Sequence, residues 1–107
     1  METQLKTLKC RACEGLEDKL SSKQIKEYLS KISGWKQEGN KIAKKLKFKD
    51  FQSSLDFVNQ VGKLAEQEDH HPDIEFGWGY ATITLTTHSL KGLSINDFIL
   101  AAKIDSI

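Results

Sequence analysis

Proline, cysteine and long apolar runs are scarce in this chain of 107 residues, which has one proline and two cysteines. No stretch is apolar over enough length to span a bilayer, and residues 1–16 mix lysine, glutamate and cysteine where a secretory signal would be apolar. The net charge of +1 supplies no strong field that would attract phosphate backbones or anionic lipid. We therefore expect a soluble cytoplasmic protein whose main partner is neither nucleic acid nor membrane.

Histidine is also rare, and its three copies lie in one region of the sequence. His70 and His71 precede Pro72, and His88 follows after a short interval. Imidazole is the side chain whose unperturbed pKa allows it both to give and to take a proton near neutral pH. The cluster indicates a proton-transfer site, although a histidine pair beside a proline, taken alone, is more often a surface turn.

The two cysteines form a CxxC motif, Cys10 and Cys13, on a segment that looks irregular. This spacing offers half of a zinc site or a redox pair, but a closed structural zinc site needs four ligands and no second CxxC exists. Adjacent histidines point in different directions, so His70 and His71 are poorly suited to completing the site. We expect no metal, and we interpret residues 1–20 as a mobile arm with reduced thiols that precedes a single domain over residues 21–107.

Hydrophobic periodicity predicts three helices. Ser21-Ser22-Lys23-Gln24 resembles a capping box before an amphipathic segment that Gly34 ends. Asp50 is a suitable N-cap for the longest helix, over residues 51–68. Ser94 starts a last helix, whose expected buried side consists of Ile95, Phe98, Ile99 and Ala102.

Alternating apolar residues predict two hairpins. Residues 35–38 and 42–48 flank the turn dipeptide Gly39-Asn40. The lysines of this hairpin are typical of a solvated strand face, which we favour over a nucleic-acid stripe. Residues 74–78 and 80–88 form the second hairpin, with a threonine-rich face that ends in His88.

These elements predict an α+β fold in the order α-β-β-α-β-β-α, with an antiparallel four-stranded sheet and three helices packed on one face. The apolar surface of the helix over residues 51–68 covers about half of its circumference. A small domain has limited means of covering so wide a stripe, so we expect a homodimer or homotetramer.

The combined spacing Glu66-x3-His70-His71-Pro72-x5-Trp78-x9-His88-x8-Asp97 resembles the signature of the pterin-4a-carbinolamine dehydratases. The resemblance runs from Ser21 onward and includes Gly34-Trp35 and Phe48-Lys49-Asp50-Phe51. Animal members generally lack the CxxC, which is familiar from microbial or plant relatives. The predicted order of elements is similar to the fold of this family.

The resemblance implies dehydration of 4a-hydroxytetrahydrobiopterin to quinonoid dihydropterin, in the recycling of tetrahydrobiopterin, without metal or cofactor. It implies that His70 and His88 transfer protons and that His71 holds the pterin. It also implies functional coupling to an aromatic amino-acid hydroxylase, which releases this substrate.

Further candidate residues surround the histidines in this interpretation. Glu66 and Asp69 would orient imidazoles or bind the guanidine-like edge of the pterin, and Trp35 would lie against its planar ring. The remaining candidates for substrate binding are Thr86, Thr87 and Asp97.

Some alternatives stay open. Asp97 could serve only to complement the dipole of its helix, Trp78 could belong to the core or to an interface, and Glu66 could be a solvated helix carboxylate. For the whole chain, the alternatives are a protein-binding module or transcriptional coactivator that acts through the helix over residues 51–68, and a small zinc protein.

Overall fold

A four-stranded antiparallel sheet and three α-helices form the α+β fold that the sequence predicted. The computed structural model describes residues 4–10 and 18–107. The sheet has the order β1-β2-β4-β3, so each hairpin contributes one inner and one edge strand. Its strands are β1 (Lys36–Glu38), β2 (Lys41–Lys47), β3 (Asp73–Gly77) and β4 (Tyr80–Leu85).

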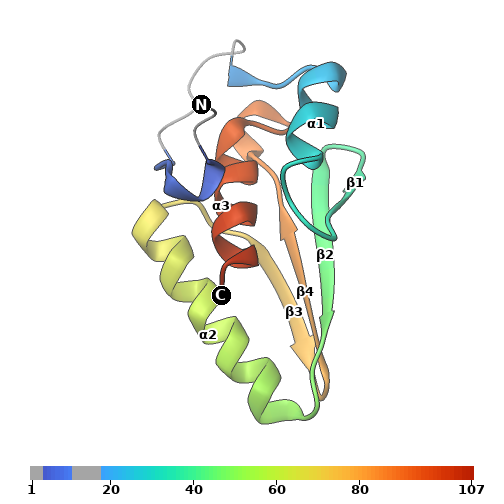
Figure 1. Ribbon diagram of the computed structural model, residues 1–107, viewed down its shortest axis with the longest axis vertical. Coiled ribbons are helices and arrows are strands. Elements are labelled where there is room, and N and C mark those ends of the chain that lie inside the picture. The colour runs from blue at the N-terminus through green and yellow to red at the C-terminus, as the bar shows by residue number, and fades with distance from the viewer. Residues whose placement is uncertain (1–3, 11–17) are drawn as a thin grey trace.

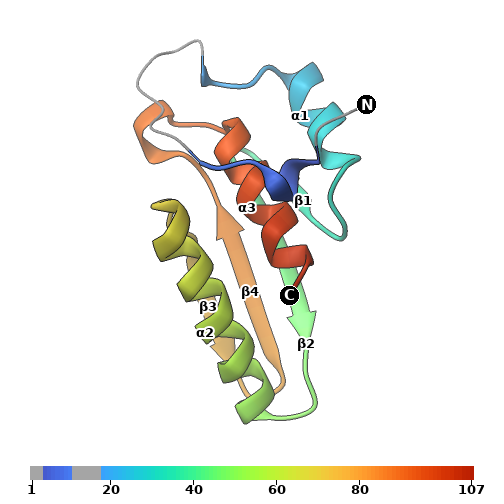
Figure 2. The same ribbon diagram turned by 60° about the vertical axis from the view of Figure 1, so that its left-hand side comes forward.

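Three α-helices and two short 3-10 helices have both of their ends within the described residues. They are η1 (Leu5–Thr7), α1 (Ser22–Leu29), α2 (Phe51–Glu68), η3 (His88–Leu90) and α3 (Ile95–Asp105). Figures 1 and 2 show α2 and α3 against the sheet, with α1 near the end where α3 begins. No helix in residues 4–10 and 18–107 is long and apolar enough to cross a membrane.

Local sequence sets the starts of the helices as predicted, whereas α1 ends at Leu29, before the Gly34 that was expected to end it. Ser21 caps α1, and its side chain and that of Gln24 form the reciprocal hydrogen bonds of a capping box. The carboxylate of Asp50 accepts from the backbone N–H of Ser53 at the start of α2. At its other end α2 stops at Asp69, which has the left-handed conformation with φ 51° and ψ 41°.

One face of the sheet packs on the helices. Ile42 pairs with Leu85, and Leu46 pairs with Ala81, so these apolar side chains share the inner face. Lys44 has the same parity, and its ammonium forms an ion pair with Asp105 at 2.8 Å. The alternation of apolar residues and lysines in β2 is therefore as predicted, except at Lys44.

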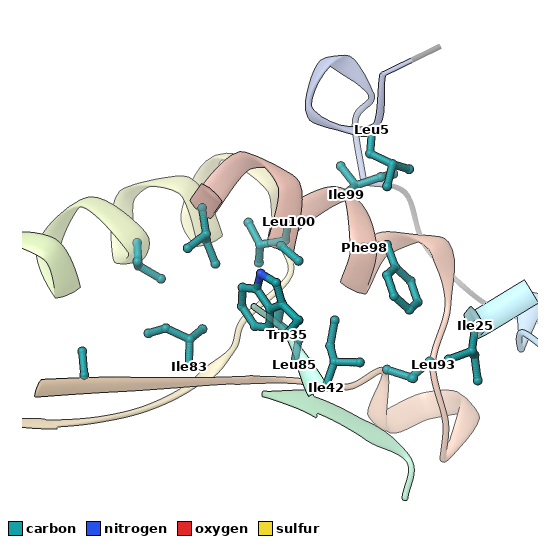
Figure 3. Packing of buried hydrophobic residues seen from close by; sticks show 14 of the residues in the cluster. Leu5, Ile25, Trp35, Ile42, Ile83, Leu85, Leu93, Phe98, Ile99 and Leu100 are labelled. Carbon is teal, nitrogen blue, oxygen red and sulfur yellow. The ribbon is translucent and has the colours of Figure 1, made fainter. Parts of the chain in front are cut away.

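The core lies between the sheet and α3, and it includes part of the N-terminal segment. Figure 3 shows Trp35 between Leu100 and the strand residues Ile83 and Leu85. On the other side of α3, Leu5 of η1 contacts the core beside Ile99 and is itself buried. Helix α3 is therefore buried on two sides, whereas the sequence suggested one.

Three sequence-based expectations need correction. Strand β4 ends at Leu85, since Thr87 forms a bridge with Gly92 and His88 starts η3. Trp78, expected in the core or at an interface, is 71% exposed between the glycines of the β3–β4 turn and is therefore not a core residue. The buried face of α2 is formed by Ser54, Phe57, Val61, Ala65 and Glu68, so its exposed apolar surface lies elsewhere, around Phe51.

Candidate active site

A cavity of about 420 Å³ lies where the end of α2, the segment after β4 and the start of α3 meet. This volume lies within the usual range for small-molecule sites. All three histidines contribute to the wall. The lining residues are Cys10, Glu68, Asp69, His70, His71, Thr86, Thr87, His88, Ser89 and Asn96.

The end of α2 determines where the histidine pair lies. The backbone N–H groups of Asp69 and His70 both donate to the carbonyl of Ala65, which closes the last turn. Pro72 cannot continue a helical hydrogen-bond ladder, and β3 begins directly after it, at Asp73. His70 and His71 therefore occupy the short junction between helix and strand that the sequence predicted.

His70 is held by a buried carboxylate on α3. Its Nε2 lies 2.6 Å from Oδ1 of Asp97, whose side chain is fully buried. Oδ2 of Asp97 accepts from the hydroxyl of Thr87 at 2.9 Å and from the backbone N–H of Ser94 at 3.0 Å. A carboxylate that accepts from His70 places the ring hydrogen on Nε2, so that Nδ1 of the neutral imidazole carries the lone pair. Asp97 thus orients His70, beyond any effect on the dipole of its helix.

His71 has a different environment, because its partner is exposed. Its Nε2 lies 2.5 Å from Oε2 of Glu66, five residues earlier in the chain, and both side chains are mostly exposed. Glu66 does not line the cavity itself. Glu66 therefore contacts this site only through the ring of His71.

His88 reaches the same cavity from the segment that follows β4. It is the first residue of η3, it is exposed, and it follows the segment that leaves β4. Its place in the wall brings it together with His70 and His71, as the sequence suggested without being able to fix the distance.

The two threonines line the cavity but use their hydroxyls within the protein. The Thr86 hydroxyl donates to the carbonyl of Asn40 at 2.6 Å, and the Thr87 hydroxyl donates to Asp97. Asp69 is exposed and lines the cavity at the helix end. Of these three, only Asp69 has a side chain that accepts hydrogen bonds and lies in contact with solvent.

Trp35 lies outside the cavity, and its expected stacking on a substrate ring does not fit its position. It is 7% exposed in the core, and its Nε1–H donates to Oδ1 of Asp105 at 2.9 Å. The β1–β2 hairpin that carries it belongs to the opposite edge of the sheet from β3. We therefore assign Trp35 to the core.

Sequence analysis missed five residues of the site or its support. Cys10, Ser89 and Asn96 line the cavity, Glu68 lines it from the end of α2, and the backbone N–H of Ser94 donates to Asp97. No local pattern distinguished Glu68 from the other helix carboxylates; its burial was the missing information. Within residues 4–10 and 18–107, no group of three or more His, Cys, Asp or Glu residues could hold a metal ion. Cys13 lies outside the described residues.

An α+β domain with three imidazoles around one cavity, two of them paired with carboxylates, has the composition of an acid–base site. Comparison with known proteins agrees with this class. Residues 18–107 match the family model described as pterin 4 alpha carbinolamine dehydratase.

Individual relatives extend the match to almost the whole chain. A protein of Azoarcus sp. (strain BH72) named "Putative pterin-4-alpha-carbinolamine dehydratase" is 45% identical, over 100% of this chain and 93% of its own. A protein of the same name from Vibrio vulnificus (strain YJ016) is 47% identical, over 96% and 97% of the two chains.

Two solved structures have similar folds. The transcriptional coactivator/pterin dehydratase from Brucella melitensis superposes with a TM-score of 0.79 at 31% identity, over 82% of this chain and 96% of that one. A pterin dehydratase-like protein identified as a RuBisCO assembly factor in the alpha-carboxysome gives 0.56 at 25% identity, over 67% and 83%. The chain belongs to the pterin-4-alpha-carbinolamine dehydratase family.

Proposed function

We propose that this protein dehydrates 4a-hydroxytetrahydrobiopterin to quinonoid dihydropterin by histidine acid–base catalysis. The observation that supports this most strongly is the convergence of His70, His71 and His88 on one cavity, with Asp97 behind His70. The family and the names of the relatives support a dehydratase that acts on a pterin.

The reaction requires one proton to be taken and one to be given. The N5–H bond of the pterin breaks and its electron pair forms the C4a–N5 double bond, while the C4a–O bond breaks and the oxygen leaves as water after protonation. Hydroxide is a poor leaving group, so the acid must act as the base accepts. No change of oxidation state occurs and no metal or cofactor is needed in this scheme.

His70 and His88 are the proposed proton-transfer pair. Because Asp97 accepts from Nε2 of His70, the lone pair on Nδ1 is available to accept a proton, and the resulting imidazolium is stabilised by the carboxylate. His88, which lines the same cavity from the segment after β4, supplies the complementary transfer. Which of the two acts as acid depends on the face of the pterin that carries the hydroxyl.

His71 and Asp69 are the proposed binding residues. Glu66 fixes the ring of His71, which then holds the pterin by a directed hydrogen bond. Asp69 is placed to accept the paired N–H donors of the guanidine-like edge of the pterin. In this scheme the enzyme acts in the cytoplasm after an aromatic amino-acid hydroxylase and so helps to recycle tetrahydrobiopterin.

The test is to generate the hydroxylated pterin in situ and follow its spectral decay with wild type, His70→Ala and His88→Ala. Loss of a general acid or base should slow turnover by roughly 10²- to 10⁴-fold. Lys47→Ala, on the solvated side of β2, serves as the control and should retain the wild-type rate. If wild-type protein does not accelerate the decay beyond its rate in buffer, the proposed enzymatic activity is rejected.

Protein binding is the second candidate function. Trp78 and Phe51 are 71% and 46% exposed, and the name of the Brucella neighbour combines coactivator and dehydratase. These residues, together with half-buried Val58 of α2, are the proposed contact for a second copy or another protein. Phe57 and Val61 are buried and cannot serve in that contact. Phe51→Glu should abolish self-association in light scattering while His70→Ala should not.

A further inference from the structure

The N-terminal segment contributes a wall of the cavity that the acid–base chemistry does not use. Cys10 lines the cavity beside Asn96, and its Sγ lies 3.5 Å from the carbonyl oxygen of Asn96. The segment also lies outside residues 18–107, which match the family model. Its position next to the histidines therefore calls for a structural cause within this chain.

A buried carboxylate fixes Cys10 in place. The side chain of Glu68 is 4% exposed, and its Oε1 accepts from the backbone N–H of Cys10 at 2.8 Å. Burial of a carboxylate is costly unless charge or hydrogen bonds compensate it. Glu68 is the last residue of α2, two residues before His70, so the bond joins the arm to the helix end that leads into the histidine pair.

Lys103 of α3 makes the second connection. Its ammonium lies 3.9 Å from Oε2 of Glu68 and donates to the carbonyl oxygen of Lys6 at 2.8 Å. Among the described residues, the two interactions of the Glu68 carboxylate therefore involve the arm or a lysine that holds the arm. Leu5, buried against α3, adds an apolar anchor at the start of the segment (Figure 3).

We propose that Cys10 forms part of the wall of the pterin cavity and is held there by a clasp, defined as the bonds of Glu68 to Cys10 and of Lys103 to Glu68 and Lys6. In this proposal Glu68 and Lys103 are positioning residues that set the affinity for pterin. The proposal rests on the proposed function for the identity of the ligand. A bound pterin then covers the Cys10 thiol, while the His70–Asp97 pair works independently of the clasp.

The first test separates binding from chemistry. Glu68→Ala removes the acceptor for Cys10, and a lost hydrogen bond of this kind should raise KM by about fivefold to tenfold while kcat changes less than about twofold. Glu68→Gln keeps an acceptor oxygen and should restore KM to near the wild-type value. Gln67→Ala, the exposed neighbour, is the matched control. A fall in kcat with unchanged KM in Glu68→Ala would contradict the proposal that Glu68 sets the affinity for pterin.

The second test measures directly whether bound pterin covers Cys10, and it can be carried out even if Glu68→Ala does not fold. In reduced Cys13→Ser protein, the rate of N-ethylmaleimide addition to Cys10 is measured with and without saturating 7,8-dihydrobiopterin. We expect the pterin to slow the addition severalfold, and Lys103→Met to weaken this protection. If the protein is active but Cys10 reacts at the same rate with and without pterin, the proposal that Cys10 lines the pterin site is refuted and the proposed function stands. Absence of both turnover and protection would reject the wall together with the proposed function.

Discussion

Replacing Asp97 by asparagine should disable His70 while leaving the fold in place. The carboxylate accepts three hydrogen bonds, from His70 at 2.6 Å, Thr87 at 2.9 Å and the backbone of Ser94 at 3.0 Å. An asparagine has one acceptor oxygen, which the fixed N–H of Ser94 and the hydroxyl of Thr87 would claim. Its amide nitrogen then faces Nε2 of His70 and can only donate.

This reversal changes the tautomer of His70. The ring must accept at Nε2, so its hydrogen moves to Nδ1 and the lone pair needed for proton transfer is lost. The corresponding loss in a serine-protease triad is about 10⁴-fold, and general acid–base catalysis contributes about 10²- to 10⁴-fold. We expect Asp97→Asn to lower kcat within this range in the hydroxypterin decay assay, and to reduce the free energy of unfolding by roughly 1.5 to 3 kcal/mol.

A matched control exists on the same helix. Asp105 also accepts three hydrogen bonds, from the backbone of Ser33, from Trp35 and from Lys44, but it lies away from the cavity. Asp105→Asn should therefore lower stability by a similar amount and leave kcat unchanged. Equal losses of activity in both variants would show that the effect of Asp97 is structural, and an unchanged kcat in Asp97→Asn would refute the reasoning.

Three further predictions concern other residues. Glu66→Gln should change KM by less than about tenfold in the decay assay, because the Glu66–His71 pair is exposed to solvent; a loss of kcat as large as that of Asp97→Asn would contradict this. Trp35→Phe should lower the unfolding free energy measured in urea by about 1 kcal/mol or more, because the hydrogen bond from Nε1–H to Asp105 is lost, and it should keep the wild-type KM. A raised KM would indicate that Trp35 contributes to substrate binding. The pKa of Asp50 lies below its ordinary value of 3.8 because the Ser53 backbone N–H donates to the carboxylate, so the stability from this charge is present above pH 3.8 and is lost as pH falls through the lowered pKa. Melting curves of wild type and Asp50→Asn should therefore converge only in strong acid, and parallel acid profiles would count against the cap.

Local patterns in the sequence were enough to predict most of the fold. The caps at Ser21 and Asp50 and the alternation Ala81, Ile83, Leu85 involve residues close together in the chain, and each of these features is confirmed. The end of β4 was not predictable in this way, because the Thr87–Gly92 bridge and η3 interrupt a threonine-rich run that reads as strand.

The site was predictable in its residues and not in its connections. The histidines and Asp97 were identified from composition and resemblance, but the His70–Asp97 bond spans 27 positions of sequence. The contacts of Cys10 with Glu68 and Asn96 span 58 and 86 positions, and no periodicity signals such pairs. The position of Trp35 was predicted wrongly for the same reason, since its hydrogen-bond partner Asp105 is 70 positions away in the sequence.

The most direct measurement of the central claim is the rate of 4a-hydroxypterin decay with the double variant His70→Ala/His88→Ala, at protein concentrations where wild type is saturating. Circular dichroism and a bound-pterin titration should first show that the variant is folded and still binds. If these two imidazoles carry the proton transfers, the decay falls to the rate in buffer. Decay at the wild-type rate would show that water loss from the pterin does not depend on these histidines.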